Sequence, residues 1–395
     1  MNRLDYFQEY WRQVNEAYRK SAGKLLDLGM GMPSPNVFRT PSLLTEKLHE
    51  SIDAGDYNLY IPPEGDRACL AEIVEYENSK LPMSARPYDE DHVMLVPGGI
   101  QAYSAILSTL APNGGQILTP VPSYFSLTAR SELHASTVTL PCDDGYNFRA
   151  QDLKLTIANG DGLSLMWFCQ PNNPTGLYIP AEELGQMIDL AAERECYLVI
   201  DESCDNYRFC PLAGNSHNIT SATVIRIKTF SKDPNFAGYR LGYLLADPEA
   251  LFRLKHIAPV LYGNPTVMAT RAILADFRMR NGKIQDDGDY EKTSLENFTR
   301  MKQSRGFLYA ALREWDRVAE VILPDACYYM FVRFLFPGTG LELFHRVLSE
   351  QLLNVVPGVV FGAPESEAWI RICFARPKEI LQDGLDRIRR ILTNC

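Results

Sequence analysis

The sequence predicts an α/β protein in which a mostly parallel, seven-stranded sheet is flanked by helices and joined to a smaller α+β domain. Two observations support this prediction. From about residue 90 onward, short apolar runs alternate with amphipathic segments, which is the pattern of successive βα units. The length of 395 residues, with 46% hydrophobic and 11% aromatic residues, is also enough to build one large core and an additional smaller one.

The strands of the large sheet are expected to be mostly parallel and buried on both faces, because helices follow several of the apolar runs. Helices are expected at Gln101–Leu110 and Ala181–Glu195. The second helix follows Pro180 and carries Glu182 and Glu183 in its first turn, where the helix dipole favours acidic residues. The expected strands are His92–Val96, Gln116–Pro120, Thr137–Pro141, Leu163–Cys169, Cys196–Asp201, Thr223–Phe230 and Leu241–Ala246.

A second, smaller domain is predicted after the acidic, glycine-bearing segment Gln285–Asp289. A long helical pattern at Leu295–Trp315 follows this segment, and two strand-like runs and an amphipathic helix come later, at Cys327–Phe334, Ala368–Phe374 and Pro377–Leu392. We therefore expect an N-terminal segment, 1–45, that joins the small domain, a large domain, 46–288, and a small C-terminal domain, 289–395.

Composition narrows the class of protein. The 39 Lys and Arg residues against 49 Asp and Glu residues give a net charge of −10, which disfavours nucleic acid as a main partner. The charged N-terminus lacks the apolar region of a secretory signal, and no run is long enough to span a membrane. Nine Cys residues without a CxxC pair indicate reduced thiols and a cytoplasmic protein. The six scattered His residues predict no metal site.

Lys232 is the first residue that predicts chemistry. It follows an expected strand in the segment Thr229–Lys232, and Arg240 comes eight residues later. The hydroxyl groups of Thr229 and Ser231 and the Arg240 guanidinium are suited to hold a phosphate. A lysine beside a bound phosphate indicates a Schiff base to pyridoxal phosphate, although a lysine in a loop, taken alone, is usually a surface residue.

Asp201 ends the apolar run that begins at Cys196, so its carboxylate should lie at the edge where open α/β sheets bind ligands. A helix N-cap is the alternative interpretation. If pyridoxal phosphate is present, an aspartate at this place pairs with the pyridine nitrogen and keeps it protonated.

Three other loops follow expected strands. The amides of Gly98, Gly99 and Ile100 can face an anion at a helix N-terminus. Tyr124 offers an aromatic face to a planar ring, but equally suits a core. Asn173 lies in the turn-forming run PNNPTG, which turn chemistry alone would explain.

The order and spacing of these motifs resemble the class I/II aminotransferases, a family of fold-type-I pyridoxal phosphate enzymes. The resemblance covers nearly the whole chain, and the lysine segment with its following arginine is its most specific motif. It implies a homodimer with shared active sites that transfers an amino group between an L-amino acid and a 2-oxo acid, with pyridoxal 5′-phosphate as the cofactor. Residues 46–288 would then form the cofactor-binding domain.

The resemblance also implies a role for each motif. Lys232 would form the Schiff base and act as the general acid/base, Asp201 would pair with the pyridine nitrogen, and Tyr124 would stack on the ring. Asn173 would donate a hydrogen bond to the phenolic oxygen and border the substrate. The phosphate would be held by Thr229, Ser231, Arg240 and the amides of Gly98, Gly99 and Ile100.

Three segments outside these loops also match the family's pattern. Gly31, within Leu28–Pro33, would line the substrate pocket. Arg371, within Trp369–Ile372, would bind the substrate α-carboxylate. Tyr60, which begins the segment YIPPEG, would reach the phosphate in the neighbouring subunit.

Two positions depart from the family's pattern. Most members have a tyrosine three residues after the pyridine-binding aspartate, where this chain has Cys204. Some members have a histidine three residues after the stacking aromatic residue, where this chain has Leu127. Cys204 could alter the electronics of the cofactor, or it could be a small buried residue whose vacated volume is filled by Tyr207 or another hydroxyl. The sequence assigns no second arginine to a substrate side chain, so the substrate stays open.

Two alternatives to transamination remain. One is a pyridoxal phosphate-dependent lyase or cyclase, similar to capreomycidine synthase, that uses the same carbanion for elimination or ring closure in a specialised biosynthetic pathway. The other is a non-catalytic, ligand-sensing domain, which we disfavour because no winged-helix-length extension precedes the domain.

Overall fold

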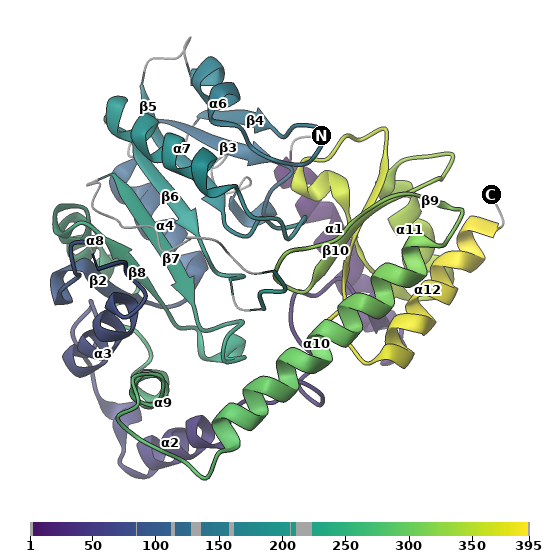
Figure 1. The fold of residues 1–395 in the computed structure, drawn as a ribbon. Helices are drawn as coiled ribbons and strands as arrows, with labels where there is room; N and C mark the ends of the chain where they lie inside the picture. Colours follow the sequence, from purple (N-terminus) through teal and green to yellow (C-terminus); the bar gives the residue numbers. More distant parts are fainter. Residues whose placement is uncertain are drawn as a thin grey trace.

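The computed structural model describes residues 3–83, 85–111, 115–127, 136–157, 162–205, 207–210 and 223–393. Its largest sheet has seven strands in the order β2-β8-β7-β6-β5-β3-β4 (Figure 1). All pairings are parallel except those of β8, which runs antiparallel to β2 and β7. The predicted sheet is thus confirmed, with strands at β2 (Val93–Val96), β3 (Gln116–Val121), β4 (Ser136–Pro141), β5 (Leu163–Cys169), β6 (Tyr197–Asp201), β7 (Val224–Thr229) and β8 (Gly242–Ala246).

Helices cover both faces of this sheet, as the continuous apolar strands predict. Successive strand residues point to opposite faces, so Trp167 packs in the core beneath α4 and α8, and Phe168 packs in the core on the other side. The first face carries α4 (Gly99–Leu110) and α8 (Pro248–Leu261). The second carries α2 (Ser42–Asp53), α3 (Arg67–Asn78), α6 (Ala150–Ile157), α7 (Ala181–Glu193) and α9 (Val267–Arg280). Short 3-10 turns lie at η1 (Asp56–Asn58), η2 (Glu90–His92) and η3 (Ala237–Tyr239).

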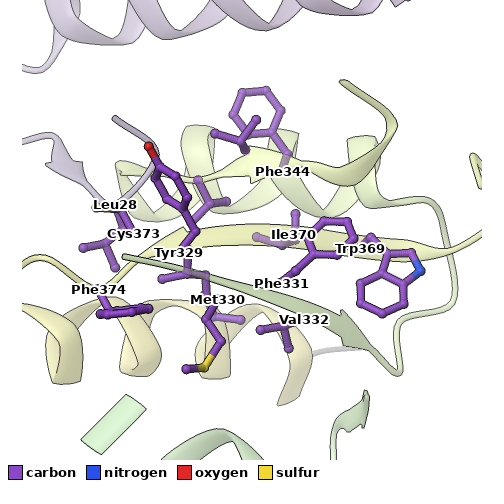
Figure 2. Close-up of a cluster of buried hydrophobic side chains, with 14 of the residues drawn as sticks. Leu28, Tyr329, Met330, Phe331, Val332, Phe344, Trp369, Ile370, Cys373 and Phe374 are labelled. Atoms are coloured by element: carbon purple, nitrogen blue, oxygen red, sulfur yellow. The ribbon is translucent and has the colours of Figure 1, made fainter. Parts of the chain in front are cut away.

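The C-terminal part of the chain packs around a four-stranded antiparallel sheet of order β12-β13-β10-β9. Figure 2 shows its core, in which the rings of Phe331 and Trp369 stack with centroids 4.5 Å apart. The elements here are β9 (Val318–Ile322), β10 (Tyr329–Phe334), α11 (Gly340–Gln351), β12 (Val356–Pro357), η4 (Gly358–Phe361), β13 (Ala368–Cys373) and α12 (Lys378–Thr393). The strand predicted from Cys327 begins two residues later, because Cys327 has a positive φ of 70° that no strand accommodates.

The N-terminal segment joins this C-terminal part. β1 (Leu26–Asp27) pairs in parallel with β11 (Leu353–Asn354), and α1 (Arg3–Lys20) packs against η4 and α11. The long helix α10 (Asp289–Arg313) begins directly after Gly288, contacts α2 near its start, and contacts β9 and α12 further along (Figure 1). The helix starts at the end of the predicted boundary segment, whereas the domain limits 1–45, 46–288 and 289–395 stay a prediction.

Candidate active site

A cavity of about 380 Å³ lies at the edge where β3, β5, β6 and β7 end. Parallel strands present their carboxyl ends at one edge of a sheet, which is where open α/β folds bind ligands. Residues of the N-terminal segment, β10 and β13 complete the lining. The sequence-predicted residues that meet there are Gly31, Gly99, Ile100, Tyr124, Asn173, Asp201, Thr229, Ser231, Lys232, Arg240 and Arg371.

Lys232 lies just beyond the end of β7, facing the N-terminal segment. Its Nζ atom donates a hydrogen bond to the carbonyl oxygen of Gly31 over 2.6 Å, and the Tyr328 hydroxyl donates to the same oxygen over 3.1 Å. Burial lowers the pKa of Lys232, because a low-dielectric environment disfavours the ammonium form. The neutral amine that this favours is nucleophilic and can accept a proton.

Asp201 ends β6 and is 4% exposed. The backbone N–H of Ser203 donates to Oδ1 over 2.9 Å, and the Tyr103 hydroxyl donates to Oδ2. Burial raises the pKa of Asp201, although these hydrogen bonds oppose the shift. Among the described residues, Asp201 accepts hydrogen bonds but forms no ion pair, and a protonated pyridine nitrogen would supply a cationic partner.

An anion cradle lies between the start of α4 and the segment from Thr229 to Arg240. Since α4 begins at Gly99, the amides of Gly99 and Ile100 belong to its unpaired first turn. A Cβ atom on Gly98 would lie 2.7 Å from Nη2 of Arg240, and one on Gly99 would lie 3.2 Å from Cγ2 of Thr229. The buried Oγ1 atom of Thr229 has no hydrogen-bond partner among the described residues. Amides, a hydroxyl and a guanidinium in this arrangement fit a phosphate.

Arg371 of β13 is buried, at 3% exposed, and lines the same cavity. Nη1 donates to Oδ1 of Asn173 over 2.9 Å, and Nη2 donates to the carbonyl oxygen of Gly29 over 2.8 Å. The Tyr329 ring lies 4.0 Å from its Cζ atom. Within the described part of the chain, the buried Nε has no hydrogen-bond partner. These neutral contacts orient the guanidinium without neutralising it, so a carboxylate ligand would fit.

Tyr60 lies apart from the cavity. Its side chain is 93% exposed, and it does not belong to the residues that line the site of its own chain. The neighbouring Tyr57 and Leu59 are also exposed, at 62% and 51%. This placement agrees with a residue that acts in another subunit, which stays a prediction.

Cys204 and Leu127, the two departures from the family's pattern, are both buried. The Cys327 thiol donates a hydrogen bond to Cys204, and this contact and the nearby Lys232 lower the pKa of Cys204. Tyr207 lies elsewhere, since it lines a separate cavity with Asp233 and Asn235. The hydroxyl-bearing rings that line the site together with Cys204 are those of Tyr103, Tyr124 and Tyr329.

Sequence reasoning missed most of the aromatic side chains of the cavity. The apolar spacing of Tyr6, Tyr10 and Val14 in α1 would have predicted an amphipathic helix there, but not which cavity it borders. The sequence singled out Gly31 but did not show why a glycine is required there. A Cβ atom at this position would lie 2.2 Å from the Tyr329 hydroxyl. The missed lining residues are Phe7, Trp11, Met30, Tyr103, Phe125, Ser126, Cys169, Ser203 and Tyr329.

Membrane-spanning helices and metal-ligand clusters are both absent from the described residues. None of their helices has the length and apolar character needed to cross a membrane. None of their His, Cys, Asp and Glu side chains form a group of three or more that could hold a metal ion.

The site thus combines a lysine with a lowered pKa, a buried carboxylate and an anion cradle at one sheet edge. These groups fit pyridoxal phosphate, whose aldehyde, pyridine nitrogen and phosphate need those three partners. The model of the family "Aminotransferase class I and II" matches residues 24–388 of the chain. The chain belongs to this family and is a pyridoxal phosphate-dependent aminotransferase.

Individual relatives agree with this assignment. The probable aspartate aminotransferase of Methanocaldococcus jannaschii is 25% identical over 382 residues, which cover 96% of each protein. The aspartate aminotransferase of Pyrococcus abyssi is 26% identical over 96% of this chain and 95% of its own. The solved structure of an alanine aminotransferase from Pyrococcus furiosus has the same fold, with a TM-score of 0.85 and 24% identity over 98% of this chain and 97% of that one. Nothing in these comparisons favours the lyase or cyclase alternative.

Proposed function

We propose that Lys232, Asp201 and Arg371 form the reactive centre at which this aminotransferase moves an amino group between an L-amino acid and a 2-oxo acid. The observation that carries the proposal is that all three side chains line one cavity. When bound, pyridoxal phosphate supplies an electron-withdrawing ring that makes the substrate Cα–H bond acidic.

Lys232 has two tasks in this proposal. Its Nζ atom would hold the cofactor until the substrate amine takes that place. The freed Nζ would then be the general base and acid that holds and moves the proton of the substrate Cα. The lowered pKa of Lys232 supports this role, since only the neutral amine can accept the proton.

The other residues bind and orient. Asp201 holds the proton on the pyridine nitrogen, and Tyr103 and Ser203 fix its two oxygen atoms. Arg371 binds the α-carboxylate, and Asn173, which accepts from Arg371 through Oδ1, keeps Nδ2 for the phenolic oxygen. Tyr124 covers one face of the ring. The phosphate is held by Thr229, Ser231, Arg240 and the amides of Gly99 and Ile100. The Gly98 amide, which the sequence also predicted to face the phosphate, instead donates to the carbonyl oxygen of Val96 over 2.7 Å.

The function is tested with the cofactor-loaded protein, a pool of amino acids and a pool of 2-oxo acids, with products identified by mass. We expect one amino acid to be consumed while an equal amount of a new amino acid forms. Without 2-oxo acids, conversion should stop after about one turnover per site. Continued turnover without an oxo acid would instead establish elimination or ring closure.

Replacing Asp201 by asparagine should weaken cofactor binding while stabilising the cofactor-free protein. Losing one partner of a buried ion pair costs about 3–5 kcal/mol, so cofactor affinity should fall at least about 100-fold. The pKa of Asp201 is raised in the folded chain, so its contribution to stability is present at low pH and lost as pH rises through that pKa. Asp201→Asn removes this loss, so at pH 7 the cofactor-free variant should melt above the wild type.

Absorbance titration with pyridoxal phosphate and thermal unfolding of the cofactor-free protein measure the two effects. Asp316→Asn, at an exposed position, is the control and should change neither. Equal cofactor affinity in Asp201→Asn and the wild type would exclude the pyridine contact.

We also propose a homodimer in which Tyr60 reaches the phosphate of the partner subunit. Its 93% exposure and the exposed apolar neighbours Tyr57 and Leu59 support this proposal. Light scattering should give twice the 44.6 kDa of one chain. Tyr60→Phe should weaken cofactor binding about 10-fold, because hydrogen bonds to charged groups contribute about 1.5–3 kcal/mol, whereas Tyr57→Phe should not. A monomer, or equal affinities in both variants, would contradict the shared site.

We further infer a cytoplasmic location and a role in amino acid metabolism or biosynthesis. The eight free cysteines among the described residues support the location, because reduced thiols are typical of that compartment. Fractionation of cells that express the protein would test it, and recovery in a secreted fraction would contradict it.

A further inference from the structure

The active-site cavity has a part that neither the cofactor contacts nor the carboxylate contact uses. In the proposed function, Lys232, Asp201 and the anion cradle bind the cofactor, and Arg371 binds the α-carboxylate of the substrate. The remaining lining residues around the substrate side are Phe7, Trp11, Met30, Phe125, Ser126 and Tyr329. All of them are apolar or aromatic except Ser126. This surface is where a substrate side chain would lie.

The aromatic side chains form a continuous wall. Phe125 is its centre: it stacks on Phe7 with centroids 4.6 Å apart and an interplanar angle of 22°, and its centroid lies 4.8 Å from that of Tyr124. Trp11 meets Phe7 edge-on at 6.2 Å. The wall therefore runs from the tyrosine predicted to cover the cofactor ring to the helix α1.

Aromatic rings also surround the carboxylate-binding arginine. The Tyr329 ring, which lines the cavity, lies 4.0 Å from Cζ of Arg371. Phe361, which is buried behind the lining, lies 5.7 Å from Phe125 and 4.9 Å from the same Cζ atom. An amino acid held at Arg371 by its α-carboxylate would therefore have aromatic surface within reach of its side chain.

The fold holds α1 in this position. Tyr10 is buried, and its hydroxyl donates to Oδ1 of Asn354 over 3.2 Å. Phe7 and Trp11 are four residues apart and so lie on one face of the helix. They border the cavity and stay only partly buried.

Among the described residues, the cavity lining offers no spare positive charge to a side-chain carboxylate. The cations in its lining, among the described residues, are Lys232, Arg240 and Arg371, and each already has a role in the proposed function. Arg12 of α1 lies outside the lining and is paired with Glu9 at 2.6 Å. A carboxylate placed against the wall would lose its hydration without gaining a partner, which costs several kcal/mol.

We propose that the preferred amino donor has an aromatic or large apolar side chain, which binds against Phe7, Trp11 and Phe125. This inference rests on the proposed function. It separates this chain from relatives that are named aspartate aminotransferases, and it makes Phe7 and Trp11 determinants of specificity. Aromatic rings gain both buried apolar area and edge-to-face contacts in such a wall.

The test measures binding, without turnover, of two carboxylic acids that lack the amine. Calorimetry on the cofactor-loaded protein would compare 3-phenylpropionate, which has a phenyl group, with succinate, which has a second carboxylate. We expect 3-phenylpropionate to bind at least about 10-fold more tightly, in line with the discrimination of apolar pockets. Equal binding, or tighter binding of succinate, would overturn the inference.

Variants of α1 identify the residues responsible. Trp11→Ala should reduce the preference for 3-phenylpropionate about 10-fold, and Trp11→Phe should retain most of it. Gln8→Ala, on the exposed side of the same helix, is the matched control and should not change it. If Trp11→Ala fails to fold, Phe7→Leu replaces it and should also reduce the preference, and an unchanged preference in Phe7→Leu would contradict the assignment.

Turnover separates this inference from the proposed function. Efficient conversion of aspartate with slow conversion of phenylalanine would leave the aminotransferase assignment intact and overturn the inference. A binding preference for 3-phenylpropionate, with no amino acid converted in any pool, would support the inference and contradict the proposed reactive centre.

Discussion

Replacing Lys232 by alanine abolishes amino transfer in our account, because it removes both the amine that holds the cofactor and the base that moves the proton. Loss of a general acid/base alone reduces rates about 10²- to 10⁴-fold, so kcat should fall at least about 10⁴-fold when both tasks are lost. Single-turnover measurements with the preferred amino acid would show the loss. The cofactor should still bind through the anion cradle and Asp201, although it would no longer be attached covalently.

Three controls make this result specific. Lys292→Ala, at an exposed position of α10, should keep full activity. Lys232→Arg keeps a cation at the site but cannot attach the cofactor covalently, so it should be as inactive as Lys232→Ala. Added small primary amines should partly restore proton transfer in Lys232→Ala. Activity of Lys232→Ala within about 10-fold of the wild type would exclude this lysine as the base.

Arg371→Lys should have the second largest effect. The guanidinium is buried and oriented by Asn173 and Gly29, and a carboxylate ligand would be bound by two parallel hydrogen bonds that an ammonium group cannot make. Losing one partner of a buried charged contact costs about 2–5 kcal/mol, so kcat/KM should fall at least about 30-fold. Cofactor affinity should stay within about threefold of the wild type.

Steady-state kinetics and a cofactor titration test both parts of this prediction. Arg333→Lys, on the neighbouring strand β10 but outside the cavity, is the matched control and should leave kcat/KM unchanged. Unchanged kinetics in Arg371→Lys would mean that another residue binds the α-carboxylate. An equal loss of cofactor binding would indicate a structural role for Arg371.

The large sheet could be predicted from the sequence because its strands are buried on both faces. A run such as Leu163–Cys169 is almost wholly apolar, so its length and its bounding turns are visible without tertiary information. β9 (Val318–Ile322) was not predicted. It is an edge strand of the smaller sheet, pairs only with β10, and is mostly half-buried, so its residues show a weaker apolar pattern.

The positions of the candidate site residues could be predicted because they follow strand ends. Asp201, Thr229 and Lys232 lie at or just beyond strands whose carboxyl ends meet at one edge. Residues brought in from distant segments could not be predicted in the same way. The contacts of Arg371 with Gly29 and Asn173 join segments that are 342 and 198 residues apart.

The buried charges next to the site also could not be predicted from the sequence. Glu202, the residue after Asp201, accepts hydrogen bonds from Arg226, whose Nη2 atom lies 2.6 Å from Oε2 of Glu202. Arg226 and Lys228 hold the pKa of Glu202 at about 2. Arg226 alternates with isoleucines in β7, a pattern that resembles a half-exposed strand. Only the fold shows that the strand's polar side chains meet Glu77 of α3 in the interior.

Every other role proposed for the site depends on Lys232 holding the cofactor, and the point of attachment can be measured. Borohydride reduction of the cofactor-loaded protein fixes the cofactor to the amine that holds it, and peptide mapping by mass then locates the modified residue. Our account predicts a single pyridoxyl group on Lys232 and none in Lys232→Ala. Recovery of the pyridoxyl group on another lysine, at one per chain and unchanged in Lys232→Ala, would contradict it.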